Sequence, residues 1–237
     1  MARIYKKTNA LEKKRLLTGG LSLAGFALFF VGIAVALFAR WFVFVPVGFA
    51  GLLLGMVMNQ KYNIYKAGIS GEAATARLLQ TLPEDYFGVQ NLKVTWNGEE
   101  SELDMVVVGP TGVFVVETKN QKGTVIGDTE EKNWILQKVG RKGGAYSKTF
   151  YNPVKQVGTH VYRLANFLRS NGTNVRVESA VYFSNPVTVV QLTGVPKNAE
   201  VFCASDNGVE KLTGYIRNRE AKLSPVQLSR IKQLLGC

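Results

Sequence analysis

Three ionisable residues stand at the ends of two neighbouring apolar segments. Asp104 opens the first segment, and Glu117 and Lys119 close the second. Both segments are rich in Val, which favours strands, and Gly109–Gly112 between them reads Gly-Pro-Thr-Gly, as in a tight turn. Side chains alternate between faces along a strand, so Glu117 and Lys119 point to the same side. Two acids and a lysine at one edge of a buried hairpin can hold a divalent cation and a water beside a phosphate.

The chemistry that this pattern indicates is metal-dependent hydrolysis of a phosphodiester. Asp104 and Glu117 would bind Mg²⁺ or Mn²⁺ through carboxylate oxygens, and Lys119 would orient the water or stabilise negative charge. An Asp…Glu-x-Lys pattern alone is weak, because an exposed strand often carries Glu-x-Lys as a solvated pair. The preceding helix with Gly71-Glu72 makes the pattern more specific. The alternative for Glu72 is that a first-turn acid only complements the helix dipole.

The segments around this hairpin predict a mixed α/β domain. Ser70 is expected to cap a helix that ends at Pro83, and Asn152-Pro153 to begin another that reaches Leu168. Asn97-Gly98 is a strong turn signal, and Gly140–Lys148 is expected to be a basic loop. The remaining expected strands are 86–96, 123–127, 134–139, 175–183, 188–192 and 200–204, and the remaining expected helices are 206–217 and 224–235.

The N-terminal quarter of the chain has the composition of a membrane segment. Residues 1–15 are polar and basic, and from Leu16 to Met58 only Arg40 is charged. A spanning helix needs about 20 apolar residues, so Leu16–Ala39 and Trp41–Met58 predict a transmembrane hairpin over residues 16–60. A cleaved signal peptide is the less favoured alternative, because its apolar region is about 7–15 residues long.

The basic flanks predict the orientation of this hairpin. Residues 1–66 hold nine Lys or Arg and one acid, so both ends are expected on the cytoplasmic side of the inner membrane. The protein would then be multi-pass with its large domain in the cytoplasm, which agrees with only two cysteines, Cys203 and Cys237. If the second segment does not span, the domain would lie outside. Gly51-x-x-x-Gly55 could pack the two helices together or form a homo-oligomer.

A second charge feature follows the Glu-x-Lys. Lys132–Arg176 contains nine Lys or Arg and no acid, with aromatic residues interleaved. Such a stretch attracts a nucleic-acid backbone, although a solvated basic face or contact with anionic lipid headgroups would also account for it. The residues expected to bind nucleic acid are Lys132, Lys138, Arg141, Lys142, Lys148 and Lys155.

Several separated motifs resemble the nuclease-related domain family, NERD, in the same order. They are Gly68-Ile-Ser-Gly71-Glu72, the stretch Glu102–Asn120, Gly123, Trp134 and Asn152-Pro153-Val154-Lys155-Gln156. The family is placed in the superfamily of PD-(D/E)xK nucleases. The resemblance implies a restriction-endonuclease-like core, a mixed central sheet flanked by helices, over residues 66–183. It leaves 16–60 as the transmembrane hairpin and 184–237 as an α/β extension packed on the same domain.

The resemblance also implies roles for individual residues. Glu72, Asp104 and Glu117 would be metal ligands, Lys119 the catalytic lysine, and Gln156 the polar residue on the following helix that supports the site. The only histidine, His160, is interpreted as a surface or half-buried helix residue. The expected function is that of a membrane-anchored, Mg²⁺-dependent nuclease acting on DNA or RNA. The alternatives are a non-cleaving nucleic-acid or protein binding module at the membrane and a scaffold that contacts anionic lipids.

Overall fold

The computed structural model describes residues 1–140, 143–197, 199–220 and 223–237. The chain divides into two compact units. One unit is the helical segment Asn9–Ser70, and the other is a folded domain made of Met1–Thr8 and Gly71–Cys237. The nucleic-acid-binding candidates Arg141 and Lys142 lie outside the described residues.

The helical unit holds α1 (Ala10–Phe38) and the larger part of α2 (Phe44–Leu79). The two helices approach closely through small residues. A Cβ atom on Gly25 would lie 2.6 Å from the backbone nitrogen of Gly55, and one on Gly51 would lie 2.7 Å from the carbonyl oxygen of Gly25. The Ser22 hydroxyl donates to the carbonyl oxygen of Gly55 at 3.0 Å. The Gly51-x-x-x-Gly55 motif therefore packs the two helices of one chain against each other.

The large apolar side chains of this unit point outward. Leu23, Phe30, Leu37 and Phe38 on α1 are each more than 60% exposed, whereas the buried positions of α1 are Thr18, Ser22, Gly25, Gly32 and Ala36. Small residues at the helix–helix contact and large apolar residues outside are the arrangement of membrane helices. A water-soluble helix pair would bury its large apolar side chains instead.

Among the described helices, only α1 is long and apolar enough to cross a membrane. The prediction of two spanning helices is therefore wrong for the second one. The predicted apolar segment began at Trp41, but α2 begins at Phe44, and its apolar part ends at Met58. These 15 residues are about 22 Å long in a helix, which is less than the ~30 Å hydrocarbon core.

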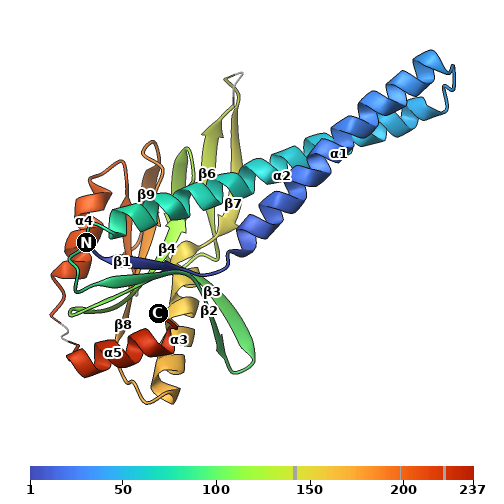
Figure 1. Ribbon diagram of the computed structural model, residues 1–237. Coiled ribbons are helices and arrows are strands. Elements are labelled where there is room, and N and C mark those ends of the chain that lie inside the picture. Colours follow the sequence, from blue (N-terminus) through green and yellow to red (C-terminus); the bar gives the residue numbers. More distant parts are fainter. Residues whose placement is uncertain (141–142, 198, 221–222) are drawn as a thin grey trace. The chain divides into compact units, whose positions relative to one another are not determined.

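The domain is built on a six-stranded mixed sheet in the order β1-β2-β3-β4-β8-β10 (Figure 1). The pairs β2–β3 and β3–β4 are antiparallel, and β1–β2, β4–β8 and β8–β10 are parallel. Its strands are β1 (Arg3–Lys6), β2 (Phe87–Trp96), β3 (Glu99–Gly109), β4 (Gly112–Lys119), β8 (Val177–Phe183) and β10 (Glu200–Cys203). The predicted mixed sheet flanked by helices is confirmed.

Successive residues of β3 and β4 enter two different cores. Val106 and Val115 pack with Leu164 of α3 (Pro153–Ser170) and Ile231 of α5 (Pro225–Leu234). The neighbouring positions, such as Val107 and Phe114, pack with Leu79 of α2 and with Leu212 of α4 (Gly208–Arg217). The hairpin is therefore buried on both faces, which explains its nearly continuous run of Val.

A second, four-stranded sheet has the order β7-β6-β5-β9. The prediction of a loop over Gly140–Lys148 is wrong from Ala145 onward, because β7 pairs with β6. Alternate residues of β6, including the fully buried Trp134, join the core under α3. The strands are β5 (Thr124–Asp128), β6 (Asn133–Val139), β7 (Ala145–Tyr151) and β9 (Val189–Thr193).

Two further predictions at the start of the chain need correction. The basic N-terminus is not only a flank of the membrane segment, because Arg3–Lys6 forms β1 and pairs with β2. Ser70 does not cap a new helix, because α2 continues through it to Leu79. No Pro interrupts residues 47–82, so nothing in the covalent chain stops the helix at Ser70.

Candidate functional site

The β3–β4 hairpin brings Asp104 and Glu117 together at its open end. Met105 pairs with Val116, so Asp104 and Glu117 are the next opposed positions of the two strands. Opposed residues project to the same face, which here is the face covered by α3. A backbone contact ties the strands at this point, because the N–H of Thr118 donates to Oδ2 of Asp104 at 2.9 Å.

Lys119 connects the hairpin to α3. Its ammonium group donates to Oε1 of Glu117 at 2.6 Å and to the side-chain oxygen of Gln156 at 2.9 Å. Asn152 begins α3 by accepting from the N–H of Val154, and this cap places Gln156 one turn into the helix. The structure therefore brings Asp104, Glu117, Lys119 and Gln156 together.

His160 is a site residue that the interpretation of the sequence placed wrongly. It is 8% exposed, and its Nε2 lies 3.5 Å from Oε2 of Glu117. The available signal was its spacing, because residues four apart lie on the same face of a helix and His160 follows Gln156 by four. Glu117 is thus flanked by Lys119 on one carboxylate oxygen and by His160 near the other.

The opposite face of β4 contacts α2. The Thr118 hydroxyl donates to the hydroxyl of Thr75, which in turn donates to the carbonyl oxygen of Gly71. Gly71 allows a close approach to the residues after β4, because a Cβ there would lie 2.6 Å from Cβ of Asn120. The next residue, Glu72, is 6% exposed at this end of the domain.

Burial and neighbouring charges shift the pKa values of three site residues. The pKa of Asp104 is raised well above its ordinary value, first by burial and then by the charge of Glu117, with a smaller contribution from Glu72. Burial alone would also raise the pKa of Glu117, but the nearby Lys119 and His160 outweigh it and lower that pKa. Burial would lower the pKa of Lys119, but Glu117 and Asp104 raise it. Lys119 is therefore charged at neutral pH.

The donor set suits a hard cation. Oε2 of Glu117 is buried without a hydrogen-bond partner, and the cost of burying a carboxylate oxygen in this way would be relieved by a cation. Asp104 supplies further oxygen ligands beside it, as Mg²⁺ or Mn²⁺ would require. Within the described part of the chain, however, no three His, Cys, Asp or Glu side chains form a metal-binding group. Among the described residues, Glu72, Asp104 and Glu117 therefore do not form a three-acid metal-binding group.

The described members of the basic stretch lie on different elements. Lys138 and Lys148 lie on one face of the β6–β7 pair, because Lys138 is opposite Tyr146 and Lys148 is opposite Leu136. Partial burial and the charge of Lys148 lower the pKa of Lys138. Lys132 precedes β6, and Lys155 lies in the first turn of α3. None of these four forms an ion pair with a described residue, whereas Arg163 and Arg176 do.

Comparisons with known proteins found similarity to a protein family and to a bacterial protein. The family model of the nuclease-related domain, NERD, matches residues 67–184. An uncharacterized protein of Bacillus anthracis is 35% identical over 92 residues, which are 38% of this chain and 43% of the relative. The chain thus spans less than half the length of this curated relative. No solved structure matches the chain significantly.

Proposed function

From the nuclease-related domain at residues 67–184, we propose that this chain is a membrane-tethered nuclease that hydrolyses phosphodiester bonds of DNA or RNA with a divalent cation. The observation that carries the proposal is the convergence of Asp104, Glu117, Lys119 and Gln156 at the open end of one hairpin. A buried ion pair beside an acid with a raised pKa is an environment in which functional groups are concentrated.

The metal ligands in this proposal are Asp104 and Glu117. A bound Mg²⁺ or Mn²⁺ supplies Lewis-acid polarisation of the phosphodiester. Glu72 adds negative charge that favours a cation at this end of the domain. Because Glu72 reaches this end from α2, the close approach of Gly71 to Asn120 positions it.

Lys119 and Gln156 act on the nucleophile and on the developing charge. The Lys119 ammonium is held between Glu117 and Gln156, so its direction is set before substrate arrives. A positive group fixed in this way orients a water and stabilises the extra negative charge of the transition state. His160 is a positioning residue that restricts the Glu117 carboxylate from the α3 side.

The nucleic-acid backbone would be bound by Lys132, Lys138, Lys148 and Lys155. These cations carry no competing ion pair among the described residues, and Lys138 and Lys148 repel each other on one face of the β6–β7 pair. A polyphosphate relieves that repulsion.

The proposed attachment to a membrane rests on α1 and on the position of β1. Because β1 precedes α1 and pairs with β2, which follows α2, both ends of residues 9–70 belong to one folded domain. Both ends then lie on one side of any membrane that α1 enters, so with the short apolar part of α2 the helix pair either thins the bilayer locally or enters it without crossing completely. This argues against a domain left outside by a single crossing, and the basic residues at both ends favour the cytoplasmic face.

The test is cleavage by the full chain in detergent. Labelled single-stranded DNA, double-stranded DNA and RNA are incubated with Mg²⁺ or Mn²⁺ and with EDTA. We expect cation-dependent products that disappear in Glu117→Gln and Lys119→Met and persist in Lys93→Met, a control at an exposed ion pair with Glu100. Intact substrate under all conditions would contradict the proposal.

A second candidate function rests on the pairing of Glu117 inside the chain. The Lys119 ammonium already pairs with Oε1 of Glu117 at 2.6 Å, so the carboxylate has a cationic partner without a metal. This favours a binding module that holds nucleic acid at the membrane without cleaving it. Such a module predicts nucleic-acid binding that is unchanged in Asp104→Ala and weaker when Lys138 and Lys148 are changed to Gln.

A further inference from the structure

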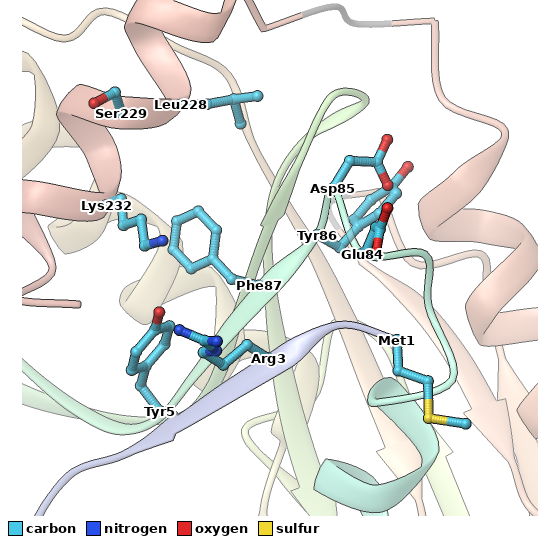
Figure 2. A pocket seen from close by; sticks show the side chains of 10 residues that line it. All are labelled: Met1, Arg3, Tyr5, Glu84, Asp85, Tyr86, Phe87, Leu228, Ser229 and Lys232. Atoms are coloured by element: carbon cyan, nitrogen blue, oxygen red, sulfur yellow. The ribbon is translucent and has the colours of Figure 1, made fainter.

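A cavity of about 650 Å³ opens at the other end of the β2–β3–β4 meander from the candidate site. Phe87 on its wall pairs with Val108, next to the turn that joins β3 to β4, whereas Asp104 and Lys119 lie at the open end of that hairpin. The cavity is bordered by β1, by the residues before β2 and by α5 (Figure 2). None of its lining residues belongs to the candidate site.

One side of this cavity carries two cations around one phenol. Figure 2 shows the Arg3 guanidinium and the Lys232 ammonium beside the Tyr5 hydroxyl. Hydrogen bonding from Arg3, opposed by some desolvation and assisted by Lys232, lowers the pKa of Tyr5. Neither cation forms an ion pair with a described carboxylate. Two like charges at one neutral oxygen repel each other, and an anion between them would remove that repulsion.

Lys232 is held in place by aromatic rings. The Lys232 nitrogen lies 5.8 Å from the ring centroids of both Tyr5 and Phe87, within the range of cation–π contacts. The two rings pack edge to face at 6.4 Å. Lys232 therefore does not need a ligand-induced movement to face the cavity, and the pairing of β1 with β2 positions the backbone of Arg3 beside it.

The other side of the cavity carries two acids. Glu84 and Asp85 are exposed, and within the described chain neither pairs with a cation; Figure 2 shows them together, across the cavity from Lys232. Met1 and Leu228 add apolar surface to the lining, which also includes Tyr86 and Ser229. Carboxylates accept hydrogen bonds from hydroxyl groups, so this cavity is complementary to a molecule with an anionic end, an apolar part and hydroxyl groups.

We propose that this cavity binds a nucleoside phosphate. The phosphate contacts Arg3, Lys232 and the Tyr5 hydroxyl, the base lies against the apolar lining, and the ribose hydroxyls donate to Glu84 or Asp85. A cavity of this size is in the usual range for small-molecule sites. The site is separate from the proposed nuclease activity, because it shares no residue with the cleavage site.

The test is calorimetric titration of the full chain in nanodiscs of zwitterionic lipid. Adenosine 5′-monophosphate is compared with adenosine, inorganic phosphate and glycerol 3-phosphate, the last of which represents a lipid headgroup. We expect the nucleotide to bind at least about tenfold more tightly than the other three, and Arg3→Gln and Lys232→Gln each to weaken it about tenfold. Lys211→Gln on α4, whose partner is Asp206, is the control and keeps full binding.

Two further variants separate this site from the cleavage site and from misfolding. Tyr5→Phe keeps the ring packing and removes only the hydroxyl. It should therefore weaken nucleotide binding even if the Arg3→Gln and Lys232→Gln variants fold poorly. Glu117→Gln keeps nucleotide binding. The proposal is overturned by no saturable binding at millimolar nucleotide, by equal binding of glycerol 3-phosphate, or by binding that is lost in Glu117→Gln and kept in Lys232→Gln.

Discussion

Replacing Lys119 with Met tests whether the candidate site is a buried ion pair. The Lys119 ammonium lies 2.6 Å from Oε1 of Glu117, and the two side chains are 18% and 2% exposed. Removing the Lys119 ammonium leaves Glu117 as a buried charge without its ion-pair partner, which lowers the free energy of unfolding by about 3–5 kcal/mol. For a chain of this size the temperature of unfolding should fall by on the order of 10 °C.

The double variant Glu117→Gln/Lys119→Met separates stability from function. It removes both charges together, so it should regain at least half of the stability that Lys119→Met loses. It should nevertheless be as inactive as either single variant, because it lacks a metal ligand and the lysine. Residues that cost stability but are required for activity are typical of functional sites.

The assay is thermal unfolding of the full chain in detergent, followed by tryptophan fluorescence. Lys93→Met is the matched control, since the Lys93–Glu100 pair is exposed and should contribute little. A buried ion pair at this site is refuted if Lys119→Met unfolds at the wild-type temperature, or if the double variant is less stable than Lys119→Met.

Three further predictions concern other contacts. Because the pKa of Asp104 is raised in the folded state, its charged form destabilises the fold at neutral pH. Asp104→Asn should therefore raise the unfolding temperature at pH 7 in the absence of a divalent cation. This gain should vanish below about pH 4, where the carboxyl group of Asp104 is protonated in both the folded and the unfolded state. Gly71→Ala should destabilise the domain by about 1–3 kcal/mol in denaturant titrations and reduce cleavage, because its Cβ would meet Asn120, whereas Gly158→Ala has open space and should not. Gly25→Leu should lower the unfolding temperature of the helical unit in detergent, because a Cβ at this position would meet the backbone of α2. Gly20→Leu is the control and should leave the unfolding temperature unchanged, because a Cβ at Gly20 has no atom within 4 Å.

Local patterns were sufficient to predict most strands and helices of the domain. The Val-rich runs on either side of Gly109–Gly112 formed β3 and β4, and Asn97-Gly98 formed a turn with both residues at positive φ. Asn152-Pro153 began α3 as expected. These signals act within a few residues, so they do not depend on the rest of the chain.

Long-range pairing was not predictable in the same way. Arg3–Lys6 is a basic tetrapeptide without a strand pattern, and it becomes β1 only because the edge of β2 offers free hydrogen-bonding groups. Ala145–Tyr151 is almost wholly exposed, so no apolar alternation marks β7. His160 was underestimated because its spacing from Gln156 has meaning only once α3 is known to cover Glu117.

The most direct test of the central claim is Mn²⁺ binding followed by electron paramagnetic resonance, since the claim is that Asp104 and Glu117 together hold a divalent cation. We expect a single saturable Mn²⁺ site in the full chain, lost in Glu117→Gln and in Asp104→Asn and retained in the exposed-pair control Lys93→Met. The same Mn²⁺ affinity in wild type and Glu117→Gln, or no saturable binding at all, would contradict the account.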